Sequence, residues 1–300
     1  MISICIPVFN FNITSLIDEL SMQIHVCKIQ AEIIIIDDGS DSFKDINKVA
    51  GEKYTYVELP QNIGRACVRN LFLSYAKYDY LLFLDCDSLI KSSSFLANYV
   101  DSIKALPAVV CGGRVYERNP PKRERRLRWR YGISRESQPC DARSQFPYRS
   151  FMTNNFLIQK TIFADNKFEE RVVKYGHEDT LLGYALKKKG IPITHIDNPV
   201  VNGEIELNSV FLDKTEMAVA NLVNILTFTN WDKDLMENIT LLRWYNKLNG
   251  IKQFVYFSFF ILEPPVVFLL KRGIVSLYLF DYYKLGLLTK KIRYSSKSKT

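Results

Sequence analysis

The sequence predicts an α/β fold in which a mostly parallel sheet is flanked by helices and followed by a helical C-terminal extension. Short apolar runs alternate with segments whose apolar residues recur at helical spacing, beginning with residues 2–8, 12–29 and 32–36. Apart from Ser3 and Glu32, the runs 2–8 and 32–36 are apolar, which is typical of strands buried on both faces of a parallel sheet. With 300 residues and 47% hydrophobic content, the chain can bury one large core and a smaller appendage.

The alternation continues to about residue 205, so residues 1–205 are predicted to form one α/β domain. The opening strands are separated by a helix, because Leu16, Leu20 and Ile24 fall on one helical face. Gly190 is expected to end a later helix in the left-handed conformation. Further strands are predicted at 54–59, 80–84, 108–111, 151–159 and 191–196, and further helices at 64–76, 93–104 and from His177 to Gly190.

The chain changes character after this point, and residues 206–300 are predicted to form a helical, aromatic-rich region. Two helices are expected between residues 207 and 247. The run 254–270 is apolar, but a glutamate and a Pro-Pro pair interrupt it, and it is short for the roughly 20 residues of a transmembrane helix. With Lys271-Arg272 after it, this run is expected either to lie in a membrane interface or to pack as an ordinary helix on the sheet domain.

The positive charge is concentrated in one segment. The formal net charge is +8, and residues 114–149 hold eleven Arg or Lys against four Asp or Glu. Such a segment suits a phosphorylated substrate or an anionic membrane surface, and the alternative is a solvated loop. We interpret it as an insert on the acceptor side of a site. Nucleic acid is not an expected partner, because aromatic residues within the Arg run are limited to Trp129 and Tyr131 and no binding motif surrounds them.

Cysteine usage and the N-terminus bear on the cellular compartment. The six cysteines are scattered without a CxxC pair, which fits free thiols in a reducing environment. No basic region precedes the first apolar residues, so no cleavable signal peptide is predicted. The expected location is cytoplasmic, with peripheral attachment to the inner face of a membrane if the basic and aromatic segments bind lipid.

Polar motifs follow successive predicted strands, at the edge where open α/β sheets bind their ligands. After the first strand, Pro7 and Phe9 would lie against a nucleotide base. After the second, Asp37 or Asp38 would accept a hydrogen bond from the base or from a ribose hydroxyl. The Asp-Asp-Gly-Ser sequence is equally a good turn former.

Two further motifs suit a diphosphate and a metal ion. The stretch from Asn62 to Asn70 places Gly64 at a helix start and Arg69 in the following turn, and both helix N-termini and guanidinium groups favour phosphate. The buried run 80–84 then delivers Asp85 and Asp87, hard oxygen donors suited to Mg²⁺ or Mn²⁺ bound to a diphosphate.

The pair Glu178-Asp179 opens a later helix and supplies a carboxylate that could take a proton from an incoming hydroxyl. Acidic residues at a helix N-terminus are also ordinary partners of the helix dipole.

Taken in order, these motifs resemble those of the inverting glycosyltransferases of family 2, which have a GT-A fold with a Rossmann-like sheet. The resemblance covers roughly residues 1–205 and rests on Pro-Val-Phe-Asn, Asp-Asp-Gly-Ser, the Asn-x-Gly-x-x-x-x-Arg-Asn helix, Leu-Asp-x-Asp and Glu-Asp-Thr, with Phe168-Glu169-Glu170 as a lead-in to the last. It implies that a uridine-like nucleotide is contacted by Pro7, Phe9, Asp37 or Asp38 and Arg69. Asp85 would contact the ribose or the donor sugar, and Asp87 would bind the metal. Asp179 would be the base, with Glu178 beside it near the acceptor.

The resemblance also implies the reaction, a single in-line displacement that inverts the anomeric carbon. A sugar would pass from a nucleotide-diphosphate sugar such as a UDP-sugar to an acceptor hydroxyl in surface polysaccharide or glycolipid synthesis. Many relatives carry a His after the final strand that completes metal or diphosphate binding, whereas this chain has Asn202. A weaker metal site, or one completed by water, is therefore expected, and His195 is expected to be structural.

Two other classes stay open. A phosphohydrolase that uses Asp-x-Asp as nucleophile and acid carries this motif on its first strand with Thr or Val following, whereas here it follows the fourth strand and precedes Ser88-Leu89. A degenerate, non-catalytic glycosyltransferase-like protein, which binds a nucleotide or a membrane partner without turnover, is kept open by the missing His.

Overall fold

The computed structural model describes residues 1–297. They form two compact units, each assembled from several stretches of the chain. The first contains Met1–Glu117, Glu136–Val173 and Glu178–Glu204, and the second contains Arg118–Arg135, Lys174–His177 and the chain from Ile205 onward. Residues 118–135 of the Arg-rich segment therefore belong to the helical unit, and the rest of that segment belongs to the sheet unit.

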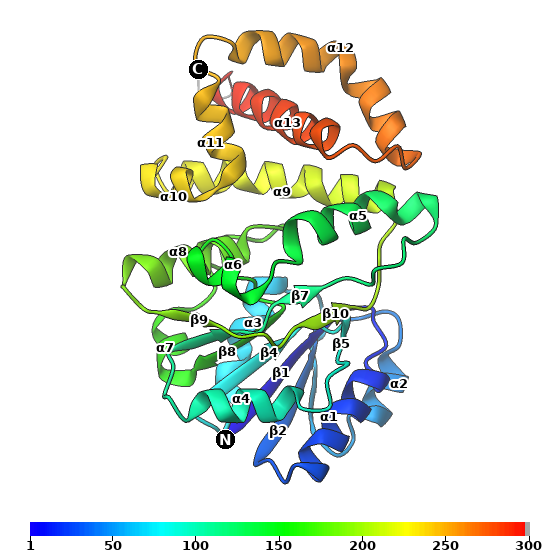
Figure 1. Cartoon of the computed structure of the whole chain (residues 1–300), viewed down its shortest axis with the longest axis vertical. Helices are drawn as coiled ribbons and strands as arrows, with labels where there is room; N and C mark the ends of the chain where they lie inside the picture. The colour runs from blue at the N-terminus through cyan, green and yellow to red at the C-terminus, as the bar shows by residue number, and fades with distance from the viewer. Residues whose placement is uncertain (298–300) are drawn as a thin grey trace. The chain divides into compact units, whose positions relative to one another are not determined.

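The first unit is built on a seven-stranded sheet with the order β3-β2-β1-β4-β8-β6-β9 (Figure 1). Neighbouring strands run parallel except at β8, which lies antiparallel between β4 and β6. The prediction of a mostly parallel α/β sheet is confirmed. The strands are β1 (Ile2–Val8), β2 (Ala31–Asp37), β3 (Thr55–Glu58), β4 (Tyr80–Leu84), β6 (Val109–Cys111), β8 (Asn155–Gln159) and β9 (Ile193–His195).

Helices cover both faces of this sheet. Successive side chains of a strand point to opposite faces, so each strand packs against helices on both sides. Ile33 and Ile35 of β2 pack in a cluster with residues of α1 and α4, whereas Ile34 and Ile36 pack in a second cluster with residues of α3, α7 and α8. The helices of this unit are α1 (Thr14–Val26), α2 (Lys44–Ala50), α3 (Arg65–Tyr75), α4 (Phe95–Ile103), α6 (Cys140–Gln145), α7 (Lys160–Asp165) and α8 (Glu178–Lys188). Gly190 follows α8 with φ at +66°, as predicted.

An aromatic cluster anchors one loop of the site to the core. Phe83 of β4 stacks on Phe156 of β8 with 5.0 Å between ring centroids. Phe168, in the loop before α8, meets both rings edge-on at 6.4 Å and is buried. The predicted Phe-x-Glu lead-in is thus held by the same residues that form the centre of the sheet.

A smaller sheet of three strands has the order β5-β10-β7. Its members are β5 (Ser88–Leu89), β10 (Val200–Asn202) and β7 (Arg114–Val115). Asn202 pairs with Ser88 in antiparallel register, and Val200 pairs with Arg114 in parallel register. The small sheet therefore ties the residues that directly follow Asp87 to two segments far away in the sequence.

The second unit is helical, which confirms the predicted C-terminal extension. Between residues 207 and 247, where two helices were predicted, the structure has three, because α10 and α11 are separate helices that meet at Ile239. Its elements are a 3-10 helix (Arg123–Arg125), α5 (Arg126–Tyr131), α9 (Asn208–Phe228), α10 (Lys233–Asn238), α11 (Thr240–Lys247), α12 (Lys252–Lys271) and α13 (Leu277–Lys297), with a π-helix at Gly132–Glu136 on its boundary.

Aromatic packing and one buried amide hold this unit together. Phe211 of α9 stacks on Phe280 of α13 at 5.1 Å, and Tyr131 of α5 packs against both rings. The Asn208 side chain is 1% exposed; it donates to the carbonyls of Arg123 and Lys271 and accepts from the amide of Leu127. Because a buried amide is costly unless it is hydrogen-bonded, these bonds specify how α5, α9 and α12 meet.

Helix α12 spans the whole apolar run 254–270 and includes Pro264 and Pro265. It packs on α13 at Gly286, where a Cβ atom would collide with the ring of Phe259. Among the residues that the structure describes, α12 alone is long and apolar enough to cross a membrane. This criterion uses only length and composition, and a core helix of a soluble protein also meets it.

Candidate active site

The loops after β1 and β2 are joined by hydrogen bonds and leave Phe9 exposed. The backbone amide of Asn10 donates to Oγ of Ser40, and Oδ1 of Asn10 accepts from the amides of Asp41 and Ser42. Pro7 pairs with Ile36 inside the sheet, while Phe9, just beyond the strand, is 47% exposed. An exposed aromatic ring on a loop that is fixed in this way can stack on a planar ligand.

The two aspartates at the end of β2 are both engaged by the protein. Oδ1 of Asp37 accepts from the amide of Ser40 at 2.7 Å, and its Oδ2 accepts from the hydroxyl of Tyr56 at 3.2 Å. The carboxylate of Asp38 accepts from the amides of Ile63 and Gly64 at 2.7 and 3.2 Å. Burial raises the pKa of Asp38 above its ordinary value, although these two amides oppose the shift. Both side chains therefore shape the rim.

The bonds from Asp38 hold the loop that starts α3. Gly64 has φ of +91°, a left-handed conformation that disfavours other residues, although a Cβ atom there would meet nothing closer than the carbonyl of Val173 at 3.6 Å. Asn62 lies just before it and is exposed. The glycine is thus required by backbone conformation and not by crowding.

Arg69 and Asp85 form a buried ion pair beneath this loop. Nη2 of Arg69 lies 2.5 Å from Oδ1 of Asp85, and the two side chains are 3% and 14% exposed. The guanidinium also lies over the ring of Phe168, 5.6 Å from its centroid. Burial alone would raise the pKa of Asp85, but Arg69, followed by Arg65 and Arg114, holds this pKa below its ordinary value.

Arg65, at the first turn of α3, connects this pair to the predicted base. Its Nη2 lies 3.4 Å from Oδ2 of Asp85, and its Nε lies 3.2 Å from Oε1 of Glu178. The predicted donor-side carboxylate and the predicted base-side pair, which are far apart in sequence, are therefore bridged by one side chain.

Asp179 has the properties of a proton acceptor at neutral pH. Its Oδ1 accepts hydrogen bonds from the amide and the hydroxyl of the adjacent Thr180, at 2.7 and 3.3 Å. Burial, and then the charge of Glu178, raise the pKa of Asp179 from 3.8 to about 6. A carboxylate with this pKa is still ionised at pH 7 and is a stronger base than an ordinary aspartate.

Asp87, the second carboxylate after β4, faces a different arginine. Nη2 of Arg114 lies 3.3 and 3.4 Å from its two oxygens. The carbonyl of Asp87 accepts from the amide of Gly203 at 2.8 Å, next to β10. Asn202, which stands where many relatives have a His, donates through Nδ2 to the carbonyl of Glu204 at 2.6 Å, and this bond does not use its Oδ1, the atom that could bind a metal.

The donor set allows a metal only with help from a substrate. No group of three or more His, Cys, Asp or Glu side chains placed to hold a metal exists within residues 1–297. Mg²⁺ is often held by one or two carboxylates, with water and substrate phosphate completing its shell. Asp87, whose side chain is 28% exposed and whose contacts with Arg114 are long, fits this kind of site, with Asp85 as its neighbour.

His195 is structural, as predicted. It is buried in β9, where its Nδ1 lies 2.8 Å from Nη1 of Arg143 and its Nε2 lies 3.0 Å from the carbonyl of Pro147. Burial lowers its pKa, so the ring is neutral at pH 7.

Sequence reasoning missed the roles of Arg65, Arg114 and Asn70. Arg65 lies four residues before Arg69 and so on the same face of α3, a signal that the helical period could have given. Asn70 binds the backbone of Phe168 through both ends of its amide and also donates to Oε1 of Glu170. Arg114 gave no local signal, since only the pairing of β7 with β10 brings it near Asp87.

Comparison with solved structures shows the same fold. The chain is similar to a mannosyltransferase from Pyrobaculum calidifontis in complex with GDP-Man and Mn²⁺, at 12% identity and a TM-score of 0.60, over 100% of this chain and 87% of that one. It is similar to residues 1–349 of TarS from S. aureus in complex with UDP, at 17% identity and a TM-score of 0.52, over 100% and 92% of the two chains.

A third similar structure is the glucosyl-3-phosphoglycerate synthase of Mycobacterium tuberculosis in complex with Mg²⁺ and UDP, at 17% identity and a TM-score of 0.51, over 75% and 78% of the two chains. No curated protein sequence matches the chain. The family model described as glycosyl transferase family 2 matches residues 3–168, which include β1 from its second residue, β2 to β4, both aspartates of the Asp-x-Asp motif and Phe168. With this match over more than half of its length, the chain belongs to glycosyl transferase family 2 and is a glycosyltransferase of the GT-A fold.

Proposed function

We propose that this glycosyltransferase moves a sugar from a UDP-sugar to an acceptor hydroxyl, with inversion of the anomeric carbon. The observation that carries the proposal is the bridge made by Arg65, which binds both Asp85 and Glu178. It brings the carboxylate of the donor side close to the pair that contains the base, as a direct displacement requires.

The donor would lie along the rim formed by the loops after β1, β2 and β4. Phe9 would stack on the base beside Pro7, and Asp37 and Asp38 would shape the floor through their backbone hydrogen bonds. Arg69 and Asp85 would lie near the ribose and the diphosphate, above the loop of Asn62 and Gly64. Uridine is favoured because two of the similar structures described above hold UDP, whereas the third holds GDP-Man.

Divalent metal use forms part of the proposal. Asp87, with Asp85 as second carboxylate, would hold Mn²⁺ or Mg²⁺, and the metal would offset charge on the departing diphosphate. The similar structures in complex with Mn²⁺ or Mg²⁺ support the use of a divalent metal.

In the proposed step Asp179 accepts the proton of the acceptor hydroxyl. The hydroxyl oxygen forms a bond to the anomeric carbon while the bond from that carbon to the diphosphate oxygen breaks, and the electron pair leaves with the nucleoside diphosphate. Attack from the face opposite the leaving group inverts the centre. Glu178 would position Arg65 and keep the pKa of Asp179 high.

The acceptor would belong to surface polysaccharide or glycolipid synthesis at the inner face of a membrane, and helix α12 supports this part of the proposal. Its inward residues Val255, Phe259, Val266 and Leu270 are buried. The opposite face carries Phe254, Phe257, Ile261 and Phe268, which are 72%, 56%, 71% and 53% exposed. These four residues, here called the α12 stripe, are flanked by Lys252, Lys271 and Arg272, a pattern that suits an anionic bilayer surface.

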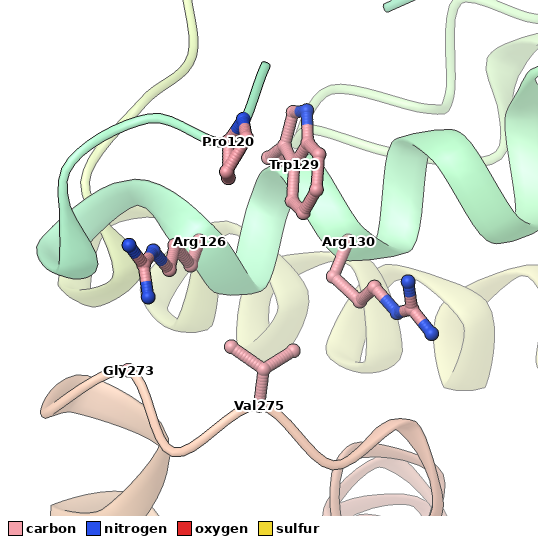
Figure 2. Close-up of a pocket in the computed structure, with 6 residues that line it drawn as sticks. All are labelled: Pro120, Arg126, Trp129, Arg130, Gly273 and Val275. Atoms are coloured by element: carbon pink, nitrogen blue, oxygen red, sulfur yellow. The ribbon is translucent and has the colours of Figure 1, made fainter. Parts of the chain in front are cut away.

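A basic cavity lies just beyond the end of α12. It measures about 430 Å³ and is lined by Pro120, Arg126, Trp129, Arg130, Gly273 and Val275. Arg126 and Arg130 come from successive turns of α5 and lie on either side of Val275 (Figure 2). No ion pair with a carboxylate involves these two arginines within the described chain, so they are suited to a lipid phosphate next to the α12 stripe.

The test is thermal-shift binding over a panel of nucleotide sugars, with and without Mn²⁺ or Mg²⁺. Metal-dependent stabilisation by one UDP-sugar is expected in the wild type and in the exposed-site control Asp101→Ala, and its loss is expected in Asp87→Ala. Stabilisation by no donor would contradict the proposed reaction and favour a non-catalytic protein. Stabilisation that still depends on the metal in Asp87→Ala would remove that residue from the metal site.

A further inference from the structure

Arg114 stands beside the carboxylate proposed to bind the metal. It spans both oxygens of Asp87 with one nitrogen, Nη2, at 3.3 and 3.4 Å. These distances are long for a charge-assisted hydrogen bond, which is shortest near 2.7–2.9 Å. The guanidinium therefore neutralises Asp87 without using all of its donor capacity.

The position of Arg114 is costly and is enforced by the fold. Its side chain is 12% exposed, and its Nε is buried without a hydrogen-bond partner. Leaving a buried donor unpaired costs about 1–3 kcal/mol. Because β7 pairs with β10, and β10 pairs with β5 directly after Asp87, the small sheet holds the arginine where it is.

Three arginines offset the carboxylates around the Asp-x-Asp motif. Asp85 is paired with Arg69 and Arg65, Arg65 is shared with Glu178, and Asp87 is paired with Arg114. Burial alone would lower the pKa of Arg114, but Asp87 and the other acidic groups around it hold this pKa above its ordinary value. This arginine is therefore charged at any working pH.

We propose that Arg114 is a second cation for the donor diphosphate and that it competes with the divalent metal for Asp87. In the metal-free protein Arg114 contributes its free donors to the diphosphate, so a nucleoside diphosphate binds without metal. When the metal binds Asp87, it does so against the charge of Arg114, which weakens metal affinity. The inference rests on the proposed function, because it assumes that the diphosphate lies at this motif.

The proposal predicts two effects of opposite sign for Arg114→Gln. UDP binding in EDTA should weaken about tenfold, the usual scale for one hydrogen bond to a charged group. Binding of Mn²⁺ to the protein without nucleotide should tighten about three- to tenfold, since Asp87 loses its neutralising partner. Loss of a merely structural arginine would weaken both.

The experiment measures both affinities directly, with calorimetry for UDP in EDTA and the electron paramagnetic resonance signal of free Mn²⁺ for the metal. Arg149→Gln, an exposed arginine of the same unit, is the matched control and should change neither affinity. Circular dichroism checks folding. Asp87→Asn supplies an independent arm if Arg114→Gln fails to fold. It frees Arg114 and should tighten metal-free UDP binding while abolishing Mn²⁺ binding.

The outcomes separate this inference from the proposed function. If UDP binds the wild type but Arg114→Gln shifts both affinities in the same direction, or shifts neither, Arg114 does not have this role. A metal-free UDP affinity that falls in Asp87→Asn would overturn it as well. If the wild type binds no nucleoside diphosphate with or without metal, the proposed function itself fails.

Discussion

Substitution of Glu178 by Gln should move the pH dependence of turnover in a direction fixed by the site. Burial and the charge of Glu178, in that order, raise the pKa of Asp179 from 3.8 to about 6. A base must be ionised to act, so activity should rise with pH through about 6 and then level off. Removing the charge of Glu178 lowers the pKa of Asp179, and the rising limb should move to lower pH.

The size of this shift can be estimated from Coulomb's law. Two unit charges on adjacent residues, taken as roughly 6 Å apart, interact by about 0.7–2.8 kcal/mol at an effective dielectric constant between about 20 and 80. Since one pH unit corresponds to 1.36 kcal/mol and burial remains the larger cause, a shift of about 1 unit is expected. At pH 5 the ionised fraction would rise from about one tenth to about one half, a gain of about fivefold relative to the plateau.

The assay measures the hydrolysis of a UDP-sugar through the UDP that is released, because water can replace the unidentified acceptor. The rising limb is measured in the pH profile of kcat/KM, because this profile gives the pKa of the base in the free enzyme. Arg65→Gln should move it the opposite way, since Arg65 lowers the pKa of Asp179. Asp38 also has a raised pKa, but Glu178 is not among its causes. An unmoved limb in Glu178→Gln, or one displaced upward, would refute Asp179 as the titrating base.

Other substitutions test the remaining assignments. Asp179→Asn should reduce turnover about 10²-fold or more, the usual scale for loss of a general base, with UDP affinity by calorimetry unchanged; near-full activity would exclude Asp179. Asn70→Ala removes three hydrogen bonds to the Phe168–Glu170 segment and should lower the free energy of unfolding in urea by about 2–4 kcal/mol; a change below about 1 kcal/mol would contradict this anchoring role. The last test is flotation at low salt with phosphatidylglycerol vesicles, in which the wild type and the exposed control Val49→Glu should float. The vesicle-bound fraction of Phe257→Glu, in the α12 stripe, should be lower by about fivefold or more. Wild type that stays at the bottom would exclude membrane binding.

The large sheet could be predicted because its signal is local. Residues 80–84 and 33–36 are apolar at every position, and the structure buries them on both faces within β4 and β2. What the local pattern could not give is the order of the strands. β8 enters between β4 and β6 in antiparallel orientation, a pairing between segments more than forty residues apart that no periodicity encodes.

The helical region shows the same limit at a smaller scale. A break near Trp231 was expected, and α9 does end before it. The second break, at Ile239, has neither Gly nor Pro beside it, and Asn238, a weaker stop signal, is the last residue of α10. In α12 the opposite happened. Two prolines suggested an interruption, but the helix continues through both of them.

The order of the motifs predicted which residues belong to the candidate site, but it did not predict the ion pairs between them. Residues with chemistry at strand ends could be named one at a time, because each follows an apolar run or opens a helix. Their partners come from elsewhere: Arg65 lies on α3, Arg114 on β7, and both reach aspartates after β4. Such contacts depend on the three-dimensional arrangement alone.

Helix α3 explains how the donor side and the base side can act together. Arg65 binds Asp85 and Glu178, and one turn later Arg69 binds Asp85 and lies over Phe168. The next residue, Asn70, fixes the backbone of Phe168, in the loop that leads to α8. A donor that drew Arg65 toward its diphosphate would take this cation from Glu178 and Asp179. Because Arg65 lowers the pKa of Asp179, donor binding would then strengthen the base at the moment an acceptor is needed.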